Sequence, residues 1–144
     1  MNAVGLEARA SWYSTFTELP HSHTAMPTSA QVSDRLARAT SLHADAVRAY
    51  QNKSSSNSLT SSSSDASFLQ KVLSSGTLSD RLSALTLLIQ SSPVHNTKAL
   101  ETLKSMVERG KGQGGREQSL KALRCVVDWW VGGGAPGRKL KYVD

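Results

Sequence analysis

The hydrophobic residues of this chain recur every three or four positions in several stretches, which is the spacing of one face of an α-helix. The clearest stretch runs from Ser74 to Leu103. Thr77, followed by Asp80 three positions later, has the character of a capping box and predicts a helix start. The apolar face of this helix is formed by Leu78, Leu82, Leu85, Leu88 and Ile89. The run from Ser91 to Pro93 then breaks the helix.

A second helix follows this break, and either Asn96 or Thr97 is placed to cap it. Its apolar face consists of Leu100, Leu103, Met106 and Val107. Two one-sided helices joined by a short connection form an αα-hairpin. Because neither helix can bury its apolar face alone, the sequence predicts a hairpin that packs against further helices.

Amphipathic helices are predicted on both sides of this hairpin. Residues 29–51 form one, whose apolar face contains Val32, Leu36, Ala39, Ala46, Val47 and Tyr50. A short helix begins at Asp65 and presents Phe68, Leu69, Val72 and Leu73. Another runs from Arg116 to Val131, with a seam of Leu120, Leu123, Val127 and Trp130. A further helix is expected to start at Pro136.

Two segments lack such periodicity. Residues 1–28 are expected to be a mostly disordered tail in which Trp12, Tyr13 and Phe16 dock on the helices of this chain, with docking on a partner as the alternative. Residues 52–65 are predicted to be a Ser-rich linker, because Ser occupies eight of the eleven positions from Ser54 to Ser64. Such a composition buries too little apolar surface to offset chain entropy, so we expect this linker to be flexible.

These elements predict an all-α fold, with HEAT/armadillo-like helical hairpins over residues 66–144. Solenoids of this kind need about three or more repeats to bury their apolar faces, and this chain offers about one and a half. We therefore expect an incomplete solenoid. Its last helix seam, with Trp129, Trp130 and Tyr142, is expected to stay partly uncovered.

The stretch SSGTLSDRLSALTLLIQSSPVHNTKALETL, the later SLKAL and the RKL at Arg138 to Leu140 resemble the CCAAT-binding-factor family, the nucleolar complex proteins that act in making the large ribosomal subunit. An upstream pair, Trp12-Tyr13, is also similar to the family. The resemblance is strongest from about Phe68 to Leu103 and covers the N-terminal part of the family's helical region. It implies a helical scaffold in the nucleus and nucleolus.

The net charge of +6 is distributed unevenly. Residues 1–97 are nearly neutral, with seven Lys and Arg against six Asp and Glu, whereas residues 98–141 hold ten basic and four acidic residues. Such asymmetry is compatible with binding RNA or an acidic partner. The alternative is that these charges only keep the outward helix faces solvated. This alternative is favoured because no aromatic residues are interleaved with the charges.

Residue patterns for catalysis, cofactor binding or metal binding are missing from the sequence. His21 and His23 have no further ligand at a spacing suited to a metal, and Cys125 is the single cysteine. The loop from Gly110 to Gly115 lacks the Lys-Ser/Thr ending of a phosphate-binding loop. No apolar run approaches the roughly 18 residues of a membrane span. We therefore expect no enzymatic activity, cofactor, small-molecule substrate or membrane partner.

The function expected is a non-enzymatic scaffold for assembly of the large ribosomal subunit. Its expected partners are ribosome assembly factors, with pre-ribosomal RNA as a further candidate. The candidate contact residues are polar positions expected to face solvent, namely Arg81, His95, Lys98, Lys104, Lys121, Arg124, Arg138 and Lys139. One alternative is a transcription regulator or cofactor, although elements for direct base readout are lacking. A truncated product without function is the other.

Overall fold

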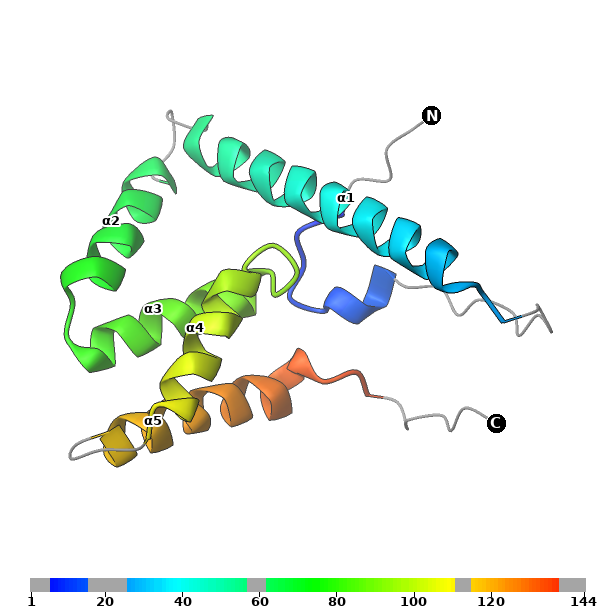
Figure 1. Ribbon diagram of the computed structural model, residues 1–144. Coiled ribbons are helices and arrows are strands. Elements are labelled where there is room, and N and C mark those ends of the chain that lie inside the picture. Colours follow the sequence, from blue (N-terminus) through cyan, green and yellow to red (C-terminus); the bar gives the residue numbers. More distant parts are fainter. Residues whose placement is uncertain (1–5, 16–25, 57–61, 111–114, 138–144) are drawn as a thin grey trace.

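The computed structural model describes residues 6–15, 26–56, 62–110 and 115–137. Figure 1 shows the arrangement of its helices, which are α1 (Ser29–Ser56), α2 (Ser62–Ser75), α3 (Leu78–Ser91), α4 (Thr97–Glu108) and α5 (Gly115–Trp129). A 3₁₀ turn, Trp12–Thr15, precedes α1, and a π-type turn, Trp130–Gly134, follows α5. Within these ranges there is no strand. The predicted all-α class is confirmed.

The α3–α4 hairpin follows the prediction closely. Thr77 caps α3: its side chain accepts a hydrogen bond from the backbone N–H of Asp80, and the Asp80 carboxylate accepts one from the backbone N–H of Thr77. This reciprocal pair satisfies two of the N–H groups that a helix start leaves without partners. The helix ends at Ser91, the first residue of the predicted break.

Asn96 performs a different role from the one expected of it. It stands at the N-cap of α4, but its side chain makes no capping bond there. Instead its Nδ2 donates to the carbonyl oxygens of Leu88 and Ser92, each at 3.0 Å. Asn96 therefore adds side-chain hydrogen bonds to two carbonyl groups that also accept backbone N–H groups, and it ties the connecting turn to the end of α3.

The core lies where α3, α4 and α5 meet. Its buried residues are Leu82, Leu85, Ile89, Ala99, Leu103, Met106 and Ala122. Leu103 and Ile89 are fully buried, which makes the two facing sides of the hairpin its centre. α5 closes this centre by packing against both α3 and α4.

The seam predicted for α5 is wrong. The side of α5 that packs on the core holds Ala122, with Cys125, Val126 and Trp129 around it. Leu120, Leu123, Val127 and Trp130 instead remain 43–57% exposed. Small side chains explain this orientation, because Ala122 and Ser119 let α5 approach α4 closely enough for the Ser119 hydroxyl to donate to the carbonyl of Val107. If α5 instead turned its leucine side chains toward α4, the two helices would lie further apart.

Helices extend into both ends of the predicted Ser-rich linker. α1 continues to Ser56, and α2 begins at Ser62 rather than at Asp65. Ser costs a helix only a few tenths of a kcal/mol relative to better formers, so established helices can continue through short Ser runs. Residues 57–61, the middle of that stretch, lie outside the described residues.

The N-terminal segment contains a 3₁₀ turn that is hydrogen-bonded to the turn after α5. The Trp12 indole Nε1 donates to the carbonyl oxygen of Gly134 at 2.8 Å, and the Tyr13 hydroxyl donates to that of Gly133 at 3.4 Å. Docking of Trp12 and Tyr13 within the chain is thus confirmed, whereas Phe16 lies outside the described residues. Pro136 and Gly137 are not helical, and the rest of the helix predicted there is also outside them.

Candidate interaction surfaces

The candidate contact residues fall into four groups. His95 was expected to face solvent, but this is wrong, since it is 5% exposed. Arg81 is half-buried, and its Nε is buried without a hydrogen-bond partner in the described chain. Arg138 and Lys139 lie outside the described residues. Four candidates are exposed on helices, namely Lys98, Lys104, Lys121 and Arg124.

Two of these exposed lysines are engaged in ion pairs along their own helices. Lys104 Nζ lies 3.4 Å from Glu108 Oε1 on α4, and Lys121 Nζ lies 2.7 Å from Glu117 Oε1 on α5. Both pairs are four positions apart, and the second has the more favourable order, with Glu on the N-terminal side of Lys. The hydrogen bond and the charge of Lys121 lower the pKa of Glu117. Neither lysine is therefore an uncompensated positive charge.

The two exposed candidate lysines of α4 do not lie on one side of that helix. Lys98 and Lys104 are six positions apart on α4, which places them roughly 120° apart around the helix axis. An RNA-binding groove would need these charges to follow one path along the surface, with aromatic residues between them. The geometry therefore favours solvated helix faces over a dedicated RNA site.

A polar cluster that the sequence did not reveal holds α1 against the hairpin. His95, in the turn between α3 and α4, shares a 2.8 Å hydrogen bond with the Ser92 hydroxyl through Nδ1. Its ring is stacked on Tyr50 of α1, with centroids 4.8 Å apart. About two helical turns earlier on α1, His43 Nε2 lies 2.7 Å from the carbonyl oxygen of Val94. We call His43, Tyr50, Ser92 and His95 the histidine cluster.

Burial is the main cause that lowers the pKa of His95 below its ordinary value. A hydrogen bond to the backbone of Leu6 acts in the opposite direction, and the nearby charge of His43 lowers the pKa further. The neutral imidazole is therefore the form that this packing favours. The cluster joins the N-terminal segment, α1 and the α3–α4 turn, so its role is to position elements.

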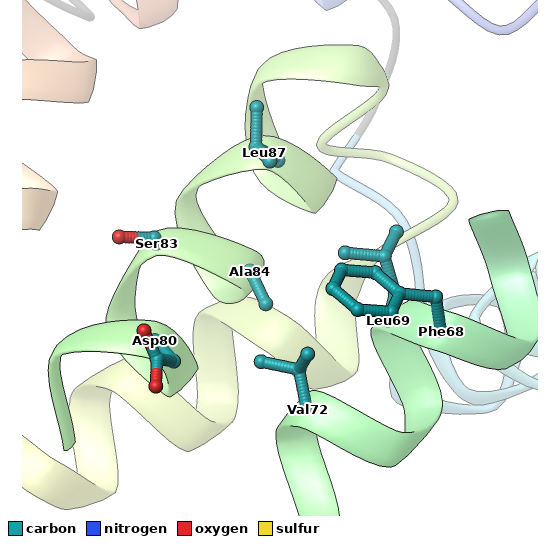
Figure 2. A pocket seen from close by; sticks show the side chains of 7 residues that line it. All are labelled: Phe68, Leu69, Val72, Asp80, Ser83, Ala84 and Leu87. Atoms are coloured by element: carbon teal, nitrogen blue, oxygen red, sulfur yellow. The ribbon is translucent and has the colours of Figure 1, made fainter. Parts of the chain in front are cut away.

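An open apolar groove lies between α2 and α3. Figure 2 shows the side chains that line it, which are Phe68, Leu69, Val72, Asp80, Ser83, Ala84 and Leu87. Phe68 and Leu87 are 64% and 58% exposed. The Asp80 carboxylate is already held by Thr77. The groove therefore offers mainly apolar contact, without the convergent polar groups of a small-molecule site.

A second apolar surface is the side of α5 that turns away from the core. We call it the α5 stripe and define it as Leu120, Leu123, Val127, Trp130 and Val131, which are 43–79% exposed. Their spacing of three or four positions places them along one side of the helix. Continuous exposed apolar surfaces of this kind mark sites of protein interaction.

Other kinds of site find no support in the described part of the chain. No group of three or more His, Cys, Asp or Glu side chains is arranged to hold a metal ion there. None of the described helices combines the length and hydrophobicity needed to cross a membrane. Cys125 is half-buried beside the core, where it packs with its apolar neighbours.

Four curated proteins resemble this chain in sequence. The Ribosome biogenesis protein NOC1 of Chaetomium thermophilum is 38% identical over 133 residues, covering 90% of this chain and 12% of that protein. An uncharacterised protein of Schizosaccharomyces pombe is 48% identical over 55% of this chain and 9% of its own length. The CCAAT/enhancer-binding protein zeta of Homo sapiens is 41% identical over 49% of this chain and 6% of its own length. No family model and no solved structure matches the chain.

The described residues form a helical protein whose sequence is similar to a ribosome biogenesis protein. This chain belongs to the CCAAT-binding factor/NOC1 family, as the resemblance over Ser74–Leu103 predicted. The chain spans between 5% and 12% of the length of the curated relatives that it matches.

Proposed function

We propose that this chain is a non-enzymatic helical scaffold segment that acts in assembly of the large ribosomal subunit, in the nucleus and nucleolus. The observation that carries the proposal is the 38% identity to a protein named Ribosome biogenesis protein NOC1, which extends over 90% of the chain. None of the four relatives is named as an enzyme.

The proposed architecture is that of a HEAT/armadillo-like repeat fragment over residues 66–144. The α3–α4 hairpin, with α5 packed against both of its helices, is compatible with stacked hairpins. In such arrays each helical face packs against a neighbour, so an apolar face left open is where another chain or element can pack. The α5 stripe and the α2–α3 groove are faces of this kind.

Protein contacts, rather than RNA contacts, are the proposed mode of action. Two exposed apolar surfaces support it, whereas the exposed lysines are partly neutralised by ion pairs on their own helices. Assembly factors are accordingly the proposed partners, with pre-ribosomal RNA as a secondary one.

The test is purification of the tagged full chain from nuclear extract, with and without nuclease, followed by identification of the recovered proteins and RNA. We expect large-subunit assembly factors that persist after nuclease treatment. Their loss on nuclease treatment would assign the contact to RNA and the basic residues instead. Recovery of chaperones alone would contradict the proposal and support the alternative of a product without function.

A role as transcription regulator is the second candidate, since two relatives are named CCAAT/enhancer-binding protein zeta. Direct base readout is not supported, because the first turns of α4 hold a single basic residue, Lys98. This candidate would therefore act as a cofactor through protein contacts. Recovery of transcription factors in the same purification, without ribosome assembly factors, would favour it.

A further inference from the structure

The α5 stripe is a set of exposed apolar side chains that runs along α5 and into the π-type turn that follows it. Leu120, Leu123, Val127, Trp130 and Val131 are 57%, 43%, 48%, 47% and 79% exposed. Positions 120, 123, 127 and 130 have the three- and four-residue spacing of the anchor residues by which an amphipathic helix binds a partner. The stripe spans about 15 Å of helix length, or roughly three turns.

The nearest described segment of this chain leaves the stripe open. The N-terminal segment packs by the other side of α5, where Ser11, Tyr13, Asp128 and Trp129 line a shared cleft. Asp128 and Trp129 lie roughly 100° or more around the axis from Val127. Because the core and the N-terminal segment both use that other side, the described residues leave the stripe open to a separate occupant.

The charges beside the stripe define what kind of occupant fits. Arg116 precedes Leu120 by four positions, and Arg124 follows it by four, so both guanidinium groups border the stripe. Both arginines are exposed, and neither forms an ion pair within the described residues. The acidic residues nearest in sequence are Glu117, which is paired with Lys121, and Asp128, which lines the cleft beside the N-terminal segment. The border of the stripe therefore carries two arginines that have no ionic partner in the described part of the chain.

A second copy of this chain fits this border poorly. A two-fold axis through the stripe would pass near its middle, between Leu123 and Val127, and would bring the two Arg124 side chains together. Like charges across an interface are costly. The last seven residues of this chain, RKLKYVD, also fit poorly, because they carry three basic residues and one acidic residue.

We propose that the α5 stripe is the docking site for an amphipathic helix of a separate protein, whose apolar side is bordered by Glu or Asp residues. The partner's apolar residues cover Leu123, Val127 and Trp130, and its carboxylates pair with Arg116 and Arg124. This inference rests on the proposed scaffold function, because it names the chemistry of a protein partner for that scaffold.

The experiment measures binding of the full chain to two labelled synthetic helices by fluorescence anisotropy. Both helices carry the same leucine stripe over about five turns, and they differ only in having Glu or Lys on its borders. We expect the Glu-bordered helix to bind at least about tenfold more tightly, with a preference that weakens as salt is raised. Sedimentation of the chain alone reports whether it dimerises.

Three variants test the location of the site. R116E/R124E is expected to remove the preference for the Glu-bordered helix. K98E/R109E, an equal charge change at two exposed positions, one on α4 and one directly after it, is expected to retain the preference. V127D is expected to weaken binding of both helices at least about tenfold, since it places a carboxylate in the stripe. Circular dichroism checks that each variant remains helical.

Several results would overturn the inference. One is binding of neither helix, and another is equal binding of both. A third is an effect of K98E/R109E as large as that of R116E/R124E. A fourth is a dimer of the chain that V127D dissociates, which would assign the stripe to a second copy. Failure here with recovery of assembly factors from nuclear extract would remove this site but keep the scaffold function. Selective binding without such recovery would keep the site and contradict the ribosomal role.

Discussion

The phenol ring of Tyr50 lies stacked against the imidazole of His95, with ring planes inclined by 26° and centroids 4.8 Å apart. Tyr50 belongs to α1 and His95 to the α3–α4 turn, which are far apart in the sequence. The contact therefore positions the long first helix relative to the hairpin. Together with the bond between His43 and the carbonyl of Val94, it is a polar junction at the edge of the apolar core.

Acid should weaken this junction. Burial lowers the pKa of His95 from the ordinary 6.5, so the unfolded chain binds a proton at a higher pH than the folded chain does. The contribution of neutral His95 to the free energy of unfolding is fully present above pH 6.5. It is lost as the pH falls from there through the lowered pKa of His95 in the folded state. Urea unfolding at a series of pH values between 8 and 5 should show a declining free energy of unfolding.

The variant His95→Gln serves as the control for this pH dependence. It should be less stable than the parent chain at pH 8, because it loses the stacked ring, and its stability should change less on acidification. An identical decline in the parent chain and in His95→Gln would show that other groups cause the effect.

Removal of the Tyr50 ring should loosen α1 without disturbing the hairpin. An aromatic pair of this kind contributes about 0.5–1.5 kcal/mol beyond the area that it buries. Tyr50→Ala should therefore speed amide exchange in the second half of α1 by about fivefold or more, with α3 and α4 unchanged. Leu36→Ala, at a position of the same helix that is 66% exposed, is the matched control and should have little effect.

Sequence patterns were sufficient to predict the α3–α4 hairpin. The apolar face of α3 is one-sided, Thr77 and Asp80 mark its start, and Pro93 follows its end. These signals are local, so they do not depend on how distant parts of the chain pack. The same reasoning could not predict the histidine cluster, because a pairing between Tyr50 and His95 depends on tertiary contacts across two other helices.

For α5 the sequence pattern was ambiguous. One side carries Leu120, Leu123 and Val127, and the other carries Ala122 and Trp129. Periodicity selects the side with the leucines, but close packing against α4 selects the side on which Ala122 leaves room for that helix. The candidate contacts were predicted from polarity and expected exposure. The burial of His95 depends on tertiary packing, and the α5 stripe is apolar, so the first was included and the second was not.

The orientation of α5 can be tested with two neighbouring substitutions. Ala122 is fully buried, and Leu123 is 43% exposed. Ala122→Leu should lower the free energy of unfolding by about 1–3 kcal/mol, because the larger side chain has no space between α4 and α5. Leu123→Ala should change it by less than about 1 kcal/mol. Denaturant unfolding of both variants checks this, and the reverse order of effects would show that the predicted seam was correct.

The turn after α5 should depend on glycine at one position and tolerate a side chain at another. A Cβ atom added at Gly134 would lie 2.6 Å from Cε2 of the Trp129 indole, whereas one at Gly132 would meet nothing within 4 Å. Since Gly134 also provides the carbonyl that binds the Trp12 indole, Gly134→Ala should displace both aromatic side chains. We expect it to destabilise the chain by about 1–3 kcal/mol. Gly132→Ala should be close to neutral, and tryptophan fluorescence during urea unfolding distinguishes the two. Equal effects of the two substitutions would mean that the N-terminal segment does not depend on this close approach.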